Sequence, residues 1–231
     1  MISNSLKTNE IANYRLSIAP MMDCTDRHFR VLMRQITKKS LLYTEMIVAQ
    51  ALHYSKNRNK LLDFDEIEHP ISIQLGGDNP HLLAEAAQMA EDWGYDEINL
   101  NVGCPSPKVK SGNFGACLMG KPKIVANCIE TMKKSCRIPI TVKHRLGIDN
   151  LDSDDYLIQF VDNCSIAGAD RFIIHARKAW LSGLNPKENR TIPPLQYDRV
   201  QELKNKRPKL IIELNGGLNT INECIKTLEK L

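Results

Sequence analysis

A cysteine flanked by backbone-shaping residues follows a strand-like segment at residues 97–105, Glu-Ile-Asn-Leu-Asn-Val-Gly-Cys-Pro. Apolar and polar residues alternate along 98–102, and this period of two predicts a β-strand with one apolar and one polar face. Gly103 and Pro105 shape the backbone on either side of Cys104, which predicts a defined loop at the carboxyl end of the strand. Parallel α/β folds place their catalytic groups at that end. The spacing alone also allows a small apolar side chain that fills a turn.

Five strand-like segments end in a polar residue on the face opposite their aliphatic side chains. They predict an inward-facing ring at the carboxyl rim of a barrel, formed by Gln74, Asn101, Lys143, His175 and Asn215. Any one of them alone would be explained by a rim salt bridge or a satisfied core histidine. Five in register argue for a binding site, because an unpaired polar group in a core costs about 1–3 kcal/mol.

The residue types of this inward-facing ring suit a flat, negatively charged heteroaromatic molecule. Amide side chains can hydrogen-bond imide and carbonyl edges, and Lys143 can stabilise negative charge on a reduced ring. Asn215-Gly216-Gly217 precedes a helix, so its backbone N–H groups are suited to binding a phosphate. A Gly-Gly pair is equally typical of an ordinary turn, and this alternative stays open.

The surrounding pattern alternates strands with helices along the chain. Strands are predicted at 16–22, 41–46, 71–75, 97–102, 139–145, 171–176 and 209–215. Helices are predicted at 26–36, in part of 47–62, at 80–93, 122–135, 154–167 and 197–206, and from Thr220 onward with Ile221, Ile225 and Leu228 buried. Seven such units predict a parallel (β/α)8 TIM barrel without its eighth strand, since a complete barrel needs about 250 residues. The long segments 105–121 and 177–196 are predicted to be functional loops.

The composition narrows the class of protein. Among 231 residues the hydrophobic share is 42% and the formal net charge is +4, which permits an anionic partner such as RNA without requiring one. No apolar run reaches the roughly 18 residues of a membrane span, and the polar arm at 1–15 lacks a signal sequence. The seven cysteines contain no C-x-x-C pair, which argues for reduced thiols in the cytoplasm and against a disulfide framework or a zinc site.

Several of these segments together resemble the tRNA-dihydrouridine synthases. The motifs that carry the resemblance are Ala19-Pro-Met-Met-Asp23, Gln74-Leu-Gly-Gly77, Asn99-Leu-Asn-Val-Gly-Cys-Pro105, Val142-Lys-His-Arg145 and Ile174-His-Ala-Arg177. His175-Ala-Arg-Lys-Ala-Trp180 with Pro186-Lys-Glu-Asn-Arg190 resembles the A subfamily, which modifies uridines 20 and 20a of the D-loop. The resemblance implies an FMN-dependent enzyme. In such an enzyme NADPH reduces the flavin, reduced FMN gives hydride to C6 of a flipped-out uracil, and a cysteine protonates C5.

The resemblance also implies roles for single residues. Cys104 is implied as the proton donor. The implied FMN contacts are Pro20, Met21 and Met22 through their backbone, Gln74, Lys143 and His175, and, at the phosphate, Asn215, Gly216 and Gly217. The implied tRNA contacts are Asn101, Lys187 and Arg190. A solvated charged loop is the alternative explanation for the last two residues.

The sequence differs from the family pattern at its carboxyl end. The family continues with an eighth strand that bears a Gly-Arg pair at the FMN phosphate and with a helical tRNA-binding domain, and neither follows within these 231 residues. We therefore expect a polar arm at 1–15 and an incomplete FMN-binding barrel of seven units at 16–231, monomeric and without metal. Two alternatives stay open: an FMN oxidoreductase on a free pyrimidine, similar to dihydroorotate dehydrogenase, and a catalytically impaired RNA-binding fragment. The basic loop with Lys187 and Arg190 argues against the free pyrimidine.

Overall fold

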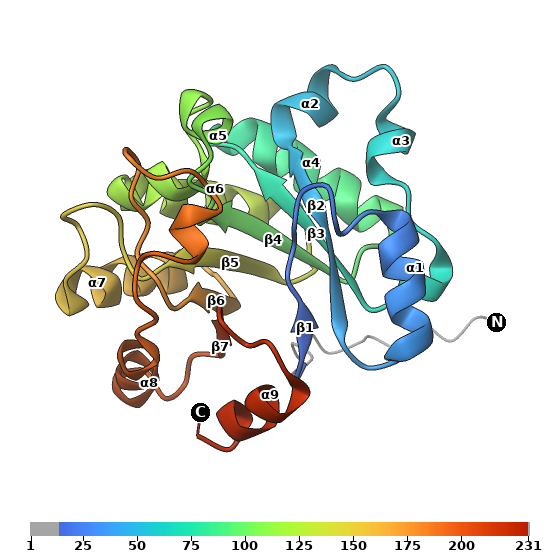
Figure 1. Ribbon diagram of the computed structural model, residues 1–231. Coiled ribbons are helices and arrows are strands. Elements are labelled where there is room, and N and C mark those ends of the chain that lie inside the picture. Colours follow the sequence, from blue (N-terminus) through green and yellow to red (C-terminus); the bar gives the residue numbers. More distant parts are fainter. Residues whose placement is uncertain (1–13, 231) are drawn as a thin grey trace.

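Seven parallel strands form one sheet in the computed structural model, which describes residues 14–230 (Figure 1). The strands are β1 (Ser17–Ile18), β2 (Leu41–Val48), β3 (Ile71–Gly76), β4 (Glu97–Val102), β5 (Ile140–Arg145), β6 (Arg171–His175) and β7 (Ile212–Asn215). Each strand pairs in parallel with its neighbour in the sequence. This curled sheet is consistent with a truncated (β/α)8 barrel, which confirms the predicted fold class. The predicted polar arm, apart from 14 and 15, lies outside the described residues.

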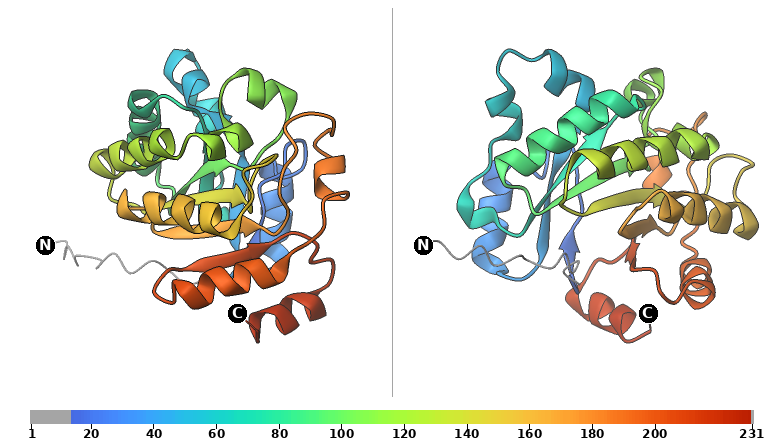
Figure 2. Two further views of the ribbon diagram at one scale, coloured as in Figure 1. Left: turned by 90° about the vertical axis from the view of Figure 1, so that its left-hand side faces the viewer. Right: turned by 180° about the vertical axis from the view of Figure 1, so that it is seen from behind.

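Helices return the chain from strand to strand and cover the outer face of the sheet (Figure 2). They are α1 (Arg27–Ile36), α2 (Ala49–Tyr54), α3 (Arg58–Leu62), α4 (Pro80–Trp93), α5 (Pro107–Ser111), α6 (Pro122–Ser135), α7 (Asp154–Ile166), α8 (Tyr197–Lys206) and α9 (Ile221–Leu228). Three short 3₁₀ helices lie in loops of the described residues: η1 (Glu66–Glu68), η2 (Gly115–Gly120) and η3 (Glu188–Arg190). On the outer face α4 packs against α6, and α6 against α7. Apolar strand residues such as Ile98, Leu100 and Val102 are fully buried in the core on this side.

Local sequence signals fix the ends of α4. The Asn79 side chain accepts hydrogen bonds from the backbone N–H groups of His81 and Leu82, and Pro80 occupies the first helical position. Gly94 ends the helix at φ +99°, a left-handed conformation that glycine adopts at least cost. The helix therefore has the bounds that the sequence predicts.

Two predictions near the ends of the chain are wrong. The strand predicted at 16–22 is confined to Ser17–Ile18, because Met21 turns the chain and its carbonyl accepts the N–H of Thr25 at 2.9 Å. The apolar residues of α9, predicted to be buried, are exposed, with Ile221 at 75%. α9 follows β7 at the open edge of the sheet (Figure 1), and an apolar helix face is buried only where another layer packs on it.

The inner face of the sheet carries a buried polar network at the amino-terminal ends of the strands. Glu97 forms an ion pair with Arg171 and accepts hydrogen bonds from Tyr43 (3.2 Å), Ser72 (3.1 Å) and Thr141 (2.8 Å). A buried ion pair is tolerated when such additional hydrogen bonds satisfy its remaining lone pairs. The amino-terminal end of the inner face therefore holds a hydrogen-bonded polar network, and the inward-facing ring lies at the opposite end.

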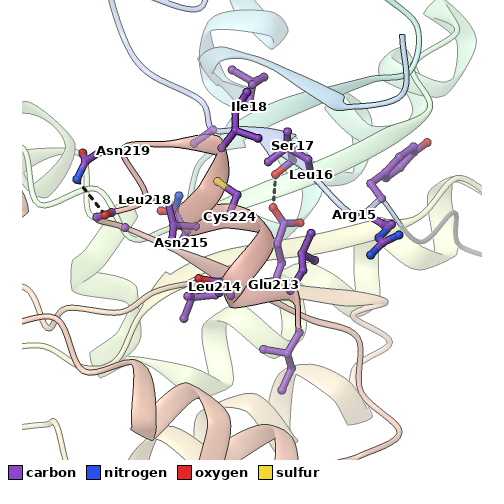
Figure 3. A pocket seen from close by; sticks show the side chains of 18 of the residues that line it. Arg15, Leu16, Ser17, Ile18, Glu213, Leu214, Asn215, Leu218, Asn219 and Cys224 are labelled. Atoms are coloured by element: carbon purple, nitrogen blue, oxygen red, sulfur yellow. Dashed lines mark hydrogen bonds between the residues drawn. The ribbon is translucent and has the colours of Figure 1, made fainter. Parts of the chain in front are cut away.

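β1 and β7 are the two edges of the sheet and do not pair with each other. A hydrogen bond from Ser17 Oγ to Glu213 Oε1 links them (Figure 3). Between them lies a cleft of about 670 Å³ lined by β1, β7 and α9, with Cys224 on the α9 side (Figure 3). The cleft also reaches Asn215 at the carboxyl end of β7, so it borders the predicted site.

Within residues 14–230, cysteines and acidic groups provide neither cross-links nor a metal centre. All seven cysteines are free thiols. No three His, Cys, Asp or Glu side chains in this range are arranged to hold a metal ion. None of the helices in the same range is long and apolar enough to cross a bilayer.

Candidate active site

The loop of Gly103 and Cys104 after β4, here the Cys104 loop, is held by Asn101. Asn101 Oδ1 accepts the backbone N–H groups of Gly103 (3.1 Å) and Cys104 (3.0 Å). The Cys104 carbonyl accepts the N–H of Ala116 in η2 at 2.9 Å. Gly115 adopts φ +73° beside it, and a Cβ there would lie 2.6 Å from the Cys104 carbonyl oxygen. The backbone that carries the half-buried thiol is therefore fixed from both sides.

Side-chain amides join β3 and β4 next to the Cys104 loop. Gln74 Nε2 donates to Asn99 Oδ1, and Asn101 Nδ2 donates to Gln74 Oε1, both at 2.8 Å. Asn99 Nδ2 in turn donates to Thr141 Oγ1 on β5 at 2.9 Å. Gln74 and Asn101 thus lie together on the inner face and hold each other in place. Each of these two amides keeps one N–H that has no partner among the described residues.

Lys143 lies on the inner face of β5 and is paired with an amide rather than an acid. Its Nζ donates to Asn215 Oδ1 at 2.9 Å, and it forms no ion pair with a carboxylate in the described part of the chain. Burial, reinforced by the charge of Arg145, lowers the pKa of Lys143 from 10.5 to about 8, while Glu213 and Cys104 oppose this shift. A rim salt bridge therefore does not explain Lys143, and an anion placed against Nζ would be stabilised.

His175 ends β6 on the inner face and is 9% exposed. Arg145 Nη1 lies 3.3 Å from His175 Nδ1. Since a guanidinium only donates, Nδ1 is the acceptor and the ring proton lies on Nε2. Burial and the positive charges of Arg145, Lys143, Arg177 and Arg190 lower the pKa of His175 to about 2. The imidazole is therefore neutral, and its Nε2–H is a hydrogen-bond donor.

Gly216 and Gly217 follow β7 with φ values of +103° and +72°, a region that favours glycine. A Cβ on Gly216 would lie 3.1 Å from His175 Nε2, and a Cβ on Gly217 would lie 2.3 Å from the Leu195 side chain. Tyr197 Oη donates to the Gly216 carbonyl at 2.6 Å and fixes this turn. The backbone therefore approaches His175 as closely as glycine permits, an arrangement that suits phosphate binding.

Pro20, Met21 and Met22 follow β1, and the two methionine residues are 47% and 56% exposed. The Met21 backbone is used inside its own turn, because its N–H donates to Thr25 Oγ1 at 3.0 Å and its carbonyl accepts the N–H of Thr25. The backbone of Met22 makes no hydrogen bond to another described residue. Of the two methionines, Met22 is therefore the one whose backbone is free for a ligand.

The outer loop, residues 177–196, adds cations beside the inward-facing ring. Lys187 and Arg190 are exposed, and neither side chain has a hydrogen bond or ion pair with another described residue. Arg177 Nη1 donates to the Pro193 carbonyl, whereas Arg177 Nε is buried without a partner in the described chain. Lys178 of this loop is paired with Asp152, but Arg177, Lys187 and Arg190 add positive charge that forms no ion pair within the described chain, which favours an anionic ligand.

Sequence reasoning missed the contacts of two residues in this site. Arg145 follows Lys143 by two positions on β5, so the strand period indicates its face but not its partners. Besides His175, its partners are the carbonyl oxygens of Gly103 (3.2 Å) and Asn189 (2.9 Å). Asn189 is fully buried within the outer loop, and no local pattern marks it, because its neighbours in sequence are polar and mostly exposed.

The curled parallel sheet, the inward-facing ring and the Cys104 loop define a (β/α)-barrel protein whose candidate active site lies at the carboxyl ends of the strands, as is general for this class. A family model described as dihydrouridine synthase (Dus) matches residues 17–231. The chain belongs to the dihydrouridine synthase family.

Curated relatives carry the name tRNA-dihydrouridine(20/20a) synthase. One from Synechocystis sp. is 61% identical over 203 residues, which cover 88% of this chain and 60% of the relative. One from Shewanella oneidensis is 48% identical over 231 residues, which cover 100% of this chain and 68% of the relative. The chain thus spans about two thirds of the length of these relatives. A solved 2-naphthoyl-CoA reductase complex shares the fold with a TM-score of 0.70 at 12% identity, covering 94% of this chain and 46% of that one.

Proposed function

We propose that this chain is the catalytic barrel of a tRNA-dihydrouridine(20/20a) synthase, which reduces uridine to 5,6-dihydrouridine in the D-loop of tRNA. One observation carries the proposal: four cations gather near the Cys104 loop and form no ion pair with an acid among the described residues. They are Lys143, Arg145, Arg177 and Arg190. Uncompensated positive charge at this rim suits a phosphate-bearing cofactor and an RNA substrate. The names of the relatives support the same substrate.

The inward-facing ring fits the isoalloxazine of FMN. Lys143 Nζ supplies a cation, and His175 Nε2 and the remaining N–H of Gln74 supply neutral donors. These groups match the carbonyl and imide edges of a flavin, and the half-buried Pro20 and the exposed Met22 offer backbone contacts. When bound, FMN reduced by NADPH would supply the hydride for C6 of the uracil.

The turn after β7 fits the FMN phosphate. Gly216 brings the backbone close to His175, and Asn215 already accepts a hydrogen bond from Lys143. The buried Nε of Arg177 has no partner among the described residues, and its positive charge reaches His175. A phosphate placed at this turn would therefore receive N–H donors and one guanidinium charge.

We assign the proton that reaches C5 of the uracil to Cys104 Sγ. Asn101 and Ala116 fix the backbone of the Cys104 loop, so the Cα and Cβ that carry the thiol are held at one place on the rim. The thiol is close enough to Lys143 and Arg145 to influence the pKa values of both. General acid catalysis of this kind contributes about 10²–10⁴-fold.

Lys187 and Arg190 are assigned to tRNA phosphates, because both are exposed and uncompensated within the described chain. Asn101 acts mainly by shaping the Cys104 loop, and its remaining N–H is left for the uracil. NADPH as reductant, a cytoplasmic location and a monomeric state belong to the same proposal. An RNA substrate carries phosphates that a basic outer loop can bind, whereas a free pyrimidine has no phosphate for such a loop.

Titration of the purified chain with FMN, followed by addition of NADPH and substrate, tests the proposal. We expect flavin binding and NADPH oxidation that accelerates with tRNA lacking dihydrouridine. Acceleration by uridine or orotate instead would favour an oxidoreductase acting on a free pyrimidine. Binding of tRNA without any binding of flavin would favour an impaired RNA-binding fragment.

A further inference from the structure

Asn189 is a fully buried amide in a part of the outer loop where the other residues, 180–188 and 190, are half-buried or exposed. Its Oδ1 accepts the N–H of Trp180 at 2.8 Å. Its Nδ2 donates to the carbonyl oxygens of Trp180 (3.0 Å), Leu184 (3.2 Å) and Asn185 (3.3 Å). The Asn189 side chain thus ties the segment between Trp180 and Asn189 together by hydrogen bonds to the backbone, in addition to the short helix η3 in which it lies.

The backbone of Asn189 joins this closed loop to the catalytic centre. Its carbonyl accepts a hydrogen bond from Arg145 Nη1 at 2.9 Å, and Arg145 Nε donates to the Gly103 carbonyl at 3.2 Å. The planar guanidinium therefore holds the outer loop and the Cys104 loop at a fixed separation. Arg145 is 4% exposed and has no acidic partner in the described chain, so these carbonyl bonds are its main anchors.

We propose that Asn189 is a positioning residue that sets where Lys187 and Arg190 stand relative to Cys104. The inference rests on the proposed function, since it concerns how a tRNA is placed over the thiol. Lys187 precedes Asn189 by two residues and Arg190 follows it directly, so both cations move with its backbone. Phosphates held by these cations would then bring the target nucleotide to a fixed point above Cys104.

The physical reason is that two long cationic side chains cannot define a position by themselves. Each side chain loses rotamer freedom when it binds a phosphate. This entropic cost is lower in total when the backbone that carries the side chain is already in place. Asn189 supplies this preorganisation for the outer loop, and Arg145 transmits it to the Cys104 loop. Loss of the amide should therefore weaken the contribution of Lys187 even though Lys187 itself is unchanged.

A double-mutant cycle tests this dependence. Asn189→Ala, Lys187→Ala and the double variant are compared with the parent, with Asn205→Ala on α8 as an exposed asparagine control. The measurements are tRNA affinity at several salt concentrations, FMN affinity and resistance of the outer loop to limited proteolysis. Asn189→Ser, which keeps one donor and one acceptor, is the milder variant if Asn189→Ala does not fold.

We expect Asn189→Ala to weaken tRNA affinity about tenfold and to reduce the slope of log affinity against log salt by roughly one per lost phosphate contact. FMN affinity should stay within about twofold, and Asn189→Ser should lie between parent and Asn189→Ala. Lys187→Ala should cost several-fold in the parent and less than about twofold beside Asn189→Ala, because neighbours that act together are not additive.

If the parent binds FMN and tRNA, and the losses in tRNA affinity of the two single variants simply add in the double variant, the positioning role is overturned. The proposed function would remain intact. Equal tRNA affinity of Asn189→Ala and parent would overturn the positioning role as well. A parent that binds neither FMN nor tRNA would instead contradict the proposed function itself.

Discussion

Replacement of Lys143 by methionine should stabilise the apoprotein and at the same time impair flavin binding. The pKa of Lys143 is lowered from 10.5 to about 8. A difference of that size means that keeping Lys143 protonated in the folded state costs roughly 3 kcal/mol relative to the unfolded chain. Removing the lysine also leaves Asn215 Oδ1 without its donor, which costs about 1–3 kcal/mol. The net gain in unfolding free energy at pH 7 is therefore roughly 1 kcal/mol.

The difference in stability between Lys143→Met and the parent is expected to depend on pH. Because the folded-state pKa of Lys143 lies below its unfolded value, the unfolded chain binds more protons between pH 8 and 10.5, and the stability of the parent rises with pH there. The stability difference between Lys143→Met and parent should shrink over the same range. Flavin affinity of the parent should fall above pH 8 as Lys143 loses its charge.

Urea unfolding of the apoprotein at pH 7 and 9.5, with FMN titrations at both pH values, measures these effects. Lys143→Gln, which removes the charge but keeps a donor for Asn215, is the matched control. The reasoning about Lys143 would be refuted if Lys143→Met were less stable than the parent at pH 7 and still bound FMN with unchanged affinity.

Three further outcomes follow from the site. Cys104→Ala should leave reduction of bound flavin by NADPH intact while slowing uridine reduction by about 10²–10⁴-fold; full turnover on tRNA would show that the thiol is structural. Gly216→Ala should lower FMN affinity, because Gly216 has a φ of +103° and the new Cβ would lie 3.1 Å from His175. An unchanged FMN affinity would show that the turn after β7 does not bind the cofactor. A chain extended to the length of the relatives should bind FMN and tRNA more tightly than residues 1–231, since β1 and β7 are unpaired edges around a cleft; equal affinities in both chains would contradict this.

The strands and the direction of their side chains could be predicted because both depend on local sequence. Period-two alternation is sufficient to place Asn101 and Lys143 on the inner face. The Asn-Pro pair marks the start of α4, and a glycine marks its end. The polar partners of these side chains come from distant strands. Asn101 pairs with Gln74 across 27 positions and Arg145 pairs with Asn189 across 44, which no local pattern encodes.

Burial was harder to predict than secondary structure. The apolar stripe of α9 has the spacing of a buried helix face, yet Ile221 is 75% exposed, because burial depends on a second layer rather than on the helix itself. The opposite holds for Asn189, a polar loop residue that the fold buries completely and satisfies with backbone partners. In both cases the deciding information is tertiary.

Site-resolved detection of dihydrouridine tests the central claim most directly. The FMN-loaded chain would be incubated with NADPH and a tRNA that lacks dihydrouridine, and the D-loop nucleosides would be identified by mass spectrometry beside a Cys104→Ala control. We predict dihydrouridine at positions 20 and 20a with the parent and far less with Cys104→Ala. A parent that retains FMN, binds the tRNA and still leaves both uridines unreduced would contradict the account.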